Sequence, residues 1–221
     1  MDNREKACKI AKKLVELFTG IESANIEKAK KFPLCNSSYD YATYYSIKEM
    51  WEEVLQKMEA LDKFATGAFK GCYFFNTQYV IKWNLLPYHE DLASVEASVW
   101  EEIPVKYRRS FPKTEIIWEG EGFCFILQER GITYEEQEET NYFSRSATQF
   151  LEDSGLLDEY NSPLTKNYVP DGWLVDLFED YGQEEIQSFN AVLEDFCIND
   201  LHEGNVGYLH GVPVILDFAG A

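Results

Sequence analysis

The sequence predicts an α+β fold in which two helices precede a sheet built from hairpins. Apolar residues recur three and four positions apart in residues 4–31 and 46–61, which is the period of an amphipathic helix. From residue 64 to residue 130 the pattern changes to strand, strand, strand, helix, strand, strand. Helices and strands that are grouped in this way, rather than alternating regularly, indicate the α+β class.

The composition indicates a folded chain that forms one two-lobed domain or a domain with a helical appendage. Of its 221 residues, 45% are hydrophobic and 15% are aromatic. That much apolar surface can offset the entropy lost on ordering the chain, which argues against disorder. The predicted division is a helical extension over residues 1–61, a part with five strands and one helix over 62–131, and a C-terminal part over 132–221.

The formal net charge is −19, from 39 acidic and 20 basic residues. We expect no direct binding to nucleic acids or anionic membranes, because their phosphates would be repelled. The charge allows two interpretations, a surface that imitates DNA and an ordinary solvated acidic surface, and we favour the second. An anionic nucleotide would need cations placed locally.

Cysteines and targeting signals favour the cytoplasm. The five cysteines are odd in number and have no C-x-x-C spacing, so the sequence suggests neither a disulfide framework nor a zinc site. The N-terminal residues lack the apolar segment of a signal peptide, and no apolar run reaches 18 residues. We therefore expect a cytoplasmic protein without a membrane span.

Each of the two N-terminal helices has one apolar face. Gly20 is expected to end the first part of the 4–31 helix. The helix over 46–61 has these apolar residues on one face: Met50, Trp51, Val54, Leu55 and Met58. We interpret both faces as packing surfaces rather than as an arm for a partner, since such stripes are usually core.

Turn residues divide the sheet region into hairpins. Strands over 72–75 and 79–83 flank Asn76-Thr77-Gln78, and strands over 115–118 and 123–127 flank a segment that reads EGEG. A helix over residues 90–102 is predicted between the two hairpins.

The C-terminal part is predicted to contain a helix and a further hairpin. Residues 132–165 are acidic and without clear period, with one candidate helix at 146–151. A helix is predicted over 182–196, where apolar residues share one face. Short apolar segments at 206–209 and 212–216 then bracket a tight turn at His210-Gly211.

Three polar side chains near the C-terminus are of the types that phosphoryl transfer needs. Asp200 and Asn205 lie in the loop after the 182–196 helix, and Asp217 follows the hairpin. A carboxylate can position or deprotonate an attacking hydroxyl, and amide and carboxylate oxygens suit Mg²⁺. The five-residue spacing of Asp and Asn has no specificity alone. The order of helix, loop, hairpin and Asp-Phe-x-Gly gives the pattern its specificity.

This order resembles the protein kinases and their relatives among small-molecule phosphotransferases. Residues 198–205 read INDLHEGN where the family has H-R-D-L-x-x-x-N, and residues 217–219 read DFA where it has D-F-G. The resemblance covers residues 64–131 and 183–220, and within the family it is to the small Ser/Thr kinases of lytic bacteriophages. It implies a two-lobed protein-kinase-like fold with an N-terminal helical extension. If the chain is phage-encoded, the expected location is the host cytoplasm.

The resemblance implies a role for each polar residue of this loop. Asp200 would be the catalytic base, and Asn205 and Asp217 would bind Mg²⁺ or Mn²⁺. His202 stands where protein kinases usually have a lysine that contacts the γ-phosphate, and aminoglycoside and choline kinases often have histidine there. His202 would then donate a hydrogen bond to the transferred phosphoryl group; the alternative is an ordinary packing or hydrogen-bonding histidine.

Upstream residues complete the resemblance. Lys82 ends a segment that reads YVIK, like the V-A-I-K strand of the family, and would bind the α- and β-phosphates of ATP. Glu96, in the 90–102 helix, would hold Lys82 in place. Glu101 and Glu102 are its rivals, and we expect both to reach water.

Two further nucleotide-binding segments rest on weaker patterns. A reduced phosphate-covering loop would consist of Gly67, Ala68 and Phe69. A plain β-turn explains these residues nearly as well. The hinge of the family would correspond to Gln128, Glu129 and Gly131, with backbone groups toward adenine and Gln128 at the back of the pocket. That assignment follows from order in the chain alone.

The sequence also departs from the family. Asn199 replaces the arginine that normally precedes the catalytic aspartate and couples it to a phosphorylated activation loop. The chain stops at Ala221, so we expect a truncated C-lobe without an activation segment. Peptide recognition would then use other surfaces.

Three functions follow as hypotheses, in this order. The first is an ATP- and Mg²⁺-dependent kinase of reduced size that phosphorylates Ser or Thr in proteins, including itself. The second is a pseudokinase-like acidic module that inhibits or binds a basic partner or imitates nucleic acid. The third is a small-molecule phosphotransferase. The sequence identifies neither the substrate or host protein partner nor the oligomeric state.

Overall fold

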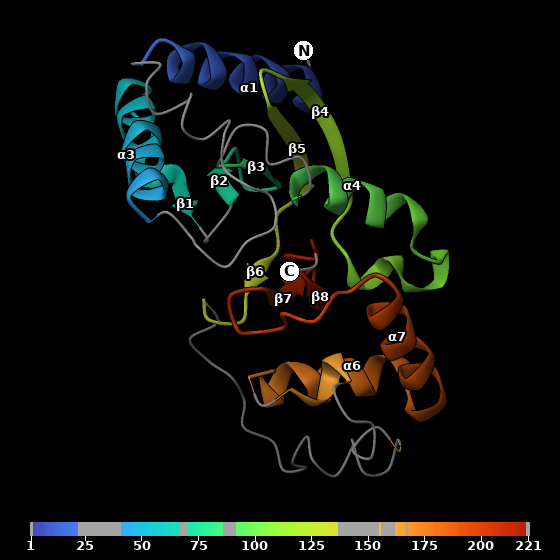
Figure 1. Ribbon diagram of the computed structural model, residues 1–221. Coiled ribbons are helices and arrows are strands. Elements are labelled where there is room, and N and C mark those ends of the chain that lie inside the picture. The colour runs from blue at the N-terminus through green and yellow to red at the C-terminus, as the bar shows by residue number, and fades with distance from the viewer. Residues whose placement is uncertain are drawn as a thin grey trace. The chain divides into compact units, whose positions relative to one another are not determined.

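The computed structural model describes residues 2–21, 41–66, 70–85, 92–136, 155, 162–166 and 168–219 (Figure 1). The chain divides into two compact units. The first unit comprises residues 1–97 and 114–129, and the second comprises residues 98–113 and 130–221.

The first unit contains a five-stranded antiparallel sheet, and the protein is of the α+β class, as predicted. The strands are β1 (Phe64–Thr66), β2 (Lys70–Phe74), β3 (Tyr79–Asn84), β4 (Thr114–Gly120) and β5 (Phe123–Glu129), in the order β1-β2-β3-β5-β4. Both predicted hairpins are confirmed. Asn76 closes the first, because its side-chain oxygen accepts hydrogen bonds from the N–H groups of Gln78 and Tyr79. Glu121 and Gly122 close the second with positive φ angles.

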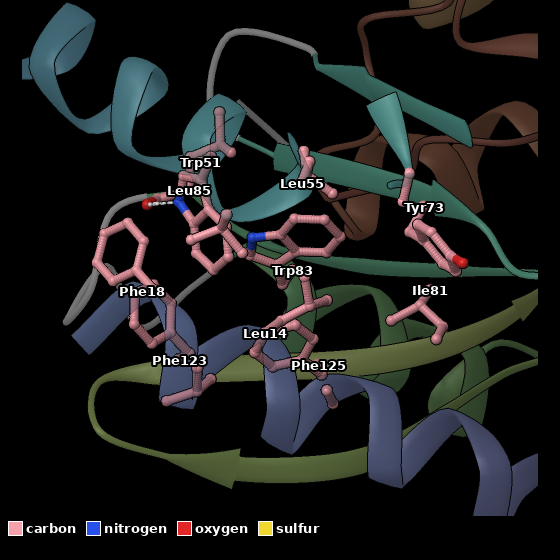
Figure 2. Close-up of a cluster of buried hydrophobic side chains, with 14 of the residues drawn as sticks. Leu14, Phe18, Trp51, Leu55, Tyr73, Ile81, Trp83, Leu85, Phe123 and Phe125 are labelled. Carbon is pink, nitrogen blue, oxygen red and sulfur yellow. Dashed lines mark hydrogen bonds between the residues drawn. The ribbon is translucent and has the colours of Figure 1, made fainter. Parts of the chain in front are cut away.

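Two N-terminal helices pack on one face of this sheet. Helix α1 (Asn3–Thr19) is capped by the Asp2 side chain and lies along β4 and β5, with α3 (Tyr41–Lys57) beside it (Figure 1). Their apolar faces meet aromatic residues of the sheet (Figure 2). The Phe18 ring stacks on Trp51 at 4.3 Å, and the Trp51 indole N–H donates to the Leu85 carbonyl at 2.9 Å. The predicted packing role of both helices is therefore confirmed.

The ends of these helices differ from the prediction. Gly20 is the C-cap of α1, as expected, and the rest of the predicted 4–31 helix, from residue 22, lies outside the described residues. Helix α3 ends at Lys57, and Leu61 already belongs to a short 3₁₀ helix (Leu61–Lys63). The reason is a left-handed turn, since Glu59 has φ 54° and the Ala60 N–H closes back onto the Leu55 carbonyl.

Helix α4 (Leu92–Glu102) covers the opposite face of the sheet. Its Ala93 and Ala97 side chains pack on Cys124 and Ile126 of β5. The pKa of the Cys124 thiol is raised to about 12. Burial is the main cause, and the negative charge of nearby Glu119 raises this pKa further. The small alanines bring the helix close to the strands, so polar groups between them are removed from water.

The second unit combines helices with a small sheet. The elements are a 3₁₀ helix η2 (Val105–Ser110), β6 (Ile132–Thr133), a 3₁₀ helix η4 (Pro163–Thr165), α6 (Asp171–Tyr181), α7 (Gln183–Asp195), β7 (Val206–Leu209) and β8 (Val212–Ile215). The strands pair antiparallel in the order β6-β7-β8. The turn predicted at His210-Gly211 is confirmed, with both φ angles positive. The helix predicted at 146–151 lies outside the described residues.

Aromatic packing holds the second unit together around α7. Phe189 stacks on Tyr181 of α6 at 4.9 Å, and Phe111 meets Phe218 edge to face at 5.2 Å. Phe218 directly follows Asp217, so this contact anchors the segment that carries the predicted metal ligand. No helix in the described ranges is long and apolar enough to cross a membrane.

Candidate functional site

Strand β3 sets the direction of Lys82. Its neighbours Ile81 and Trp83 point into the aromatic core with α1 and α3 (Figure 2). Because side chains alternate along a strand, Lys82 points to the other face, the one covered by α4. It lies opposite Cys72 of β2 and Ile126 of β5, and 8% of its surface is exposed.

Glu96 of α4 is the partner of Lys82. The Glu96 carboxylate is completely buried, with its two oxygens 3.3 and 3.4 Å from the Lys82 ammonium nitrogen. Glu101 and Glu102, the rivals for this pairing, are exposed. Among the three glutamates considered, the structure therefore brings Glu96 to Lys82.

Sequence reasoning missed a second lysine on the same carboxylate. The Lys70 ammonium nitrogen lies 2.6 Å from Glu96 Oε1, and only 11% of the Lys70 side chain is exposed. Lys70 lies two residues before Cys72, the residue opposite Lys82, so it is on the same face of the sheet. The hairpin register was the signal that could have found it.

Gln128 completes the arrangement around Glu96. Its side chain is 1% exposed and donates to Glu96 Oε2 at 3.0 Å and to the Thr114 hydroxyl at 3.1 Å. The structure thus places Gln128 in a hydrogen-bond network with Glu96. We name the group of Lys70, Lys82, Glu96, Thr114 and Gln128 the Glu96 cluster.

For the other residues predicted to bind nucleotide, the structure shows only their position or their packing. Glu129 ends β5 and is the last residue of the first unit. Gly131 belongs to the second unit, where a Cβ at its position would lie 2.5 Å from the Leu216 side chain and 3.0 Å from the Tyr208 carbonyl oxygen, so close packing already accounts for a glycine there. Gly67, Ala68 and Phe69 lie outside the described residues.

Two buried apolar residues anchor the loop between α7 and β7. Leu201 and Val206 are completely buried, whereas Asp200 is exposed. The Asn205 amide donates to the Asp200 backbone carbonyl at 2.9 Å and to its carboxylate at 3.1 Å. With Nδ2 used in this way, the Asn205 side chain offers its carbonyl oxygen to a cation.

Asp217 is adjacent to this loop. The N–H groups of Leu216 and Asp217 both donate to the Asn205 backbone carbonyl, at 2.7 and 3.2 Å. The pairing of β7 with β8 explains these two hydrogen bonds. Val206 lies opposite Ile215, so Asn205, just before Val206, lies beside the residues that follow Ile215. The predicted set of Asp200, Asn205 and Asp217 is therefore gathered at one end of the hairpin.

His202 lies in the same loop with one nitrogen already used. Its Nδ1 accepts a hydrogen bond from the Gly204 N–H at 3.0 Å, which assigns the proton of a neutral ring to Nε2. That Nε2 is 3.8 Å from the Asp200 carboxylate, and both side chains are about half exposed. His202 can thus donate a hydrogen bond from Nε2.

Tyr168 forms a hydrogen bond to the backbone at the start of this loop. Its hydroxyl donates to the Asn199 carbonyl at 2.7 Å. Burial, and then the Asp200 charge, raise the pKa of Tyr168, so the hydroxyl stays protonated and remains a donor through neutral pH.

The side chains of Asn205 and Asp217 offer oxygen donors, which Mg²⁺ prefers. Within the described part of the chain, no group of three or more His, Cys, Asp and Glu residues could hold a metal. Mg²⁺ in phosphoryl-transfer sites typically takes one or two protein carboxylates and completes its shell with phosphate oxygens and water. Asp217 offers one such carboxylate, and Asn205 offers an amide oxygen.

Comparison with known proteins gave no match: no family model, no curated protein and no solved structure is similar to this chain.

Proposed function

We propose that the protein is an ATP- and Mg²⁺-dependent phosphotransferase of the minimal protein kinase type, which transfers the γ-phosphate to Ser or Thr in proteins. The buried ion pair between Lys82 and Glu96 carries this proposal. Burying a lysine and a glutamate costs several kcal/mol of desolvation for each ion, and pairing them often does no more than offset that cost. Such a pair is better explained by a function than by stability.

The arrangement of the first unit supports the same proposal. In protein kinases the phosphate-binding lysine is on the third strand and pairs with a glutamate of the helix that follows. Here Lys82 is on β3, Glu96 is on α4, and α4 connects β3 to β4 within an antiparallel sheet. A kinase-like fold is the architecture that this proposal implies.

In the proposed reaction, a Ser or Thr hydroxyl oxygen attacks the γ-phosphorus, the bond to the leaving oxygen of ADP breaks, and the hydroxyl proton passes to the Asp200 carboxylate. Lys82 would bind phosphate oxygens while Glu96 holds its ammonium in position. Asn205 and Asp217 would hold Mg²⁺, whose charge offsets that on the phosphates. His202 would donate from Nε2 to the transferred phosphoryl group.

The direct test is transfer from γ-labelled ATP in the presence of Mg²⁺ and a mixture of protein substrates. We expect labelled protein with the natural chain and a loss of roughly a hundredfold or more in Lys82→Ala and in Asp217→Asn, since each removes a charge that acts on the phosphates. Glu203→Gln is the matched control, because Glu203 is exposed in the same loop.

Three outcomes would redirect the proposal. Absence of both transfer and ATP-dependent stabilisation would refute it. Transfer to an aminoglycoside or to choline, but to no protein, would select a small-molecule phosphotransferase. If the protein transfers nothing but binds a basic partner in spite of both substitutions, it acts as a binding module.

A further inference from the structure

Lys70 shares the buried carboxylate of Glu96 with Lys82. The two ammonium groups approach from adjacent strands, and Lys70 makes the shorter contact, 2.6 Å against 3.3 Å. Lys70 is on β2, opposite Asn84, and Lys82 is on β3, opposite Cys72, so both side chains leave the same face of the hairpin. The two cations are therefore held at one point of the first unit.

The Glu96 carboxylate accepts more donors than one lysine requires. Lys70 binds Oε1, Gln128 binds Oε2, and Lys82 lies near both oxygens. Glu96 thus fixes two cations rather than one.

Two ammonium groups beside one carboxylate favour a multiply charged anion. Like charges repel each other, and the repulsion is stronger where water is excluded. Phosphate oxygens that accept from both groups would relieve it. A chain of phosphates suits two cations on adjacent strands better than a single carboxylate or sulfate does, because it offers anionic oxygens on successive groups.

We infer that Lys70 is a second phosphate-binding residue, which acts with Lys82 on the phosphates of a nucleoside di- or triphosphate. This inference rests on the proposed function, since it places a further ligand of the same nucleotide. The alternative is a simpler role, in which Lys70 is a counterion that only neutralises Glu96.

The dissociation constants of ATP, ADP and adenosine, measured by calorimetry on the full chain, distinguish the two roles. If Lys70 contacts phosphate, Lys70→Met weakens ATP about tenfold to a hundredfold, the range for one hydrogen bond to a charged group, and leaves adenosine within about twofold. Lys70→Arg, which keeps the charge, recovers most of the lost affinity. Lys63→Gln is the control, because Lys63 is exposed in the same unit.

The pattern across ligands decides between the outcomes. If Lys70→Met weakens ATP and adenosine equally, or weakens neither, Lys70 is a structural counterion and the inference is wrong while the proposed nucleotide site stands. If the natural chain binds none of the three ligands, the proposed function fails and the inference with it. Circular dichroism checks folding, and Lys70→Gln replaces Lys70→Met if the methionine variant does not fold.

Discussion

At the scale of single residues, Glu96 is the buried carboxylate at the centre of the Glu96 cluster. It is completely buried and is bound by Lys70, Lys82 and Gln128. A charge buried in this way is tolerated only while its partners remain, because an uncompensated ion in the interior costs several kcal/mol. Loss of Glu96 would remove the carboxylate that both buried ammonium groups contact.

We therefore predict that Glu96→Ala lowers the free energy of unfolding by about 3 kcal/mol, the lower end of the range for breaking a buried ion pair. Urea denaturation followed by circular dichroism measures it. Glu102→Ala is the control, since Glu102 is exposed on the same helix and should change stability by less than about 0.5 kcal/mol. Equal losses in both variants would show that the Glu96 cluster does not hold α4 on the sheet.

At the scale of elements, α1 and α3 are part of the core of the first unit. Phe18 is completely buried, stacks on Trp51 and meets Phe123 edge to face at 5.2 Å, as Figure 2 shows. Trp51 in turn lies against Trp83 of β3, one residue from Lys82. The helices thus support, from the opposite face, the strand that carries Lys82.

Phe18→Ala should lower the free energy of unfolding by about 3–5 kcal/mol, because it leaves a cavity between α1, α3 and the sheet. Thermal or urea unfolding would measure this loss. Lys13→Ala, at an exposed position of α1, should have little effect. If the Phe18 variant were as stable as the natural chain, α1 would be an appendage that the sheet does not need.

Features that depend on neighbouring residues could be predicted from the sequence, whereas contacts between distant residues could not. The hairpin at His210-Gly211 was predictable because a two-residue turn with positive φ has a local preference for such residues. The buried contact of Lys70 with Glu96 was not, because it joins residues 26 positions apart and depends on strand register.

Helix α6 was not predicted, although its sequence contains a usable signal. Trp173, Leu174, Leu177 and Phe178 are buried and recur at helical spacing. Strand β6, by contrast, has only two residues and carries almost no local pattern. Strand β6 is defined by its pairing with β7, in which Ile132 lies opposite Tyr208. The sequence near residue 132 holds no information about a partner so far along the chain.

At the scale of the whole molecule, a net charge of −19 makes the local placement of cations decisive. An anionic nucleotide is repelled by such a chain at long range, and salt screens that repulsion beyond about 10 Å at 0.1 M ionic strength. In the proposed site, Lys70 and Lys82 would act at short range, where the low exposure of both side chains would strengthen each contact. Mg²⁺ would further reduce the charge that the nucleotide presents.

Thermal unfolding with Mg²⁺ and ATP tests most directly the proposal that the protein binds this nucleotide. A ligand at a hundred times its dissociation constant stabilises a protein by about 2.7 kcal/mol, so we expect the natural chain to melt several degrees higher. Lys82→Ala and Asp217→Asn should each abolish most of that shift, while Glu203→Gln, at an exposed position, retains it. A natural chain that does not respond to Mg²⁺ and ATP, or a shift that survives both substitutions, would contradict the proposed nucleotide binding.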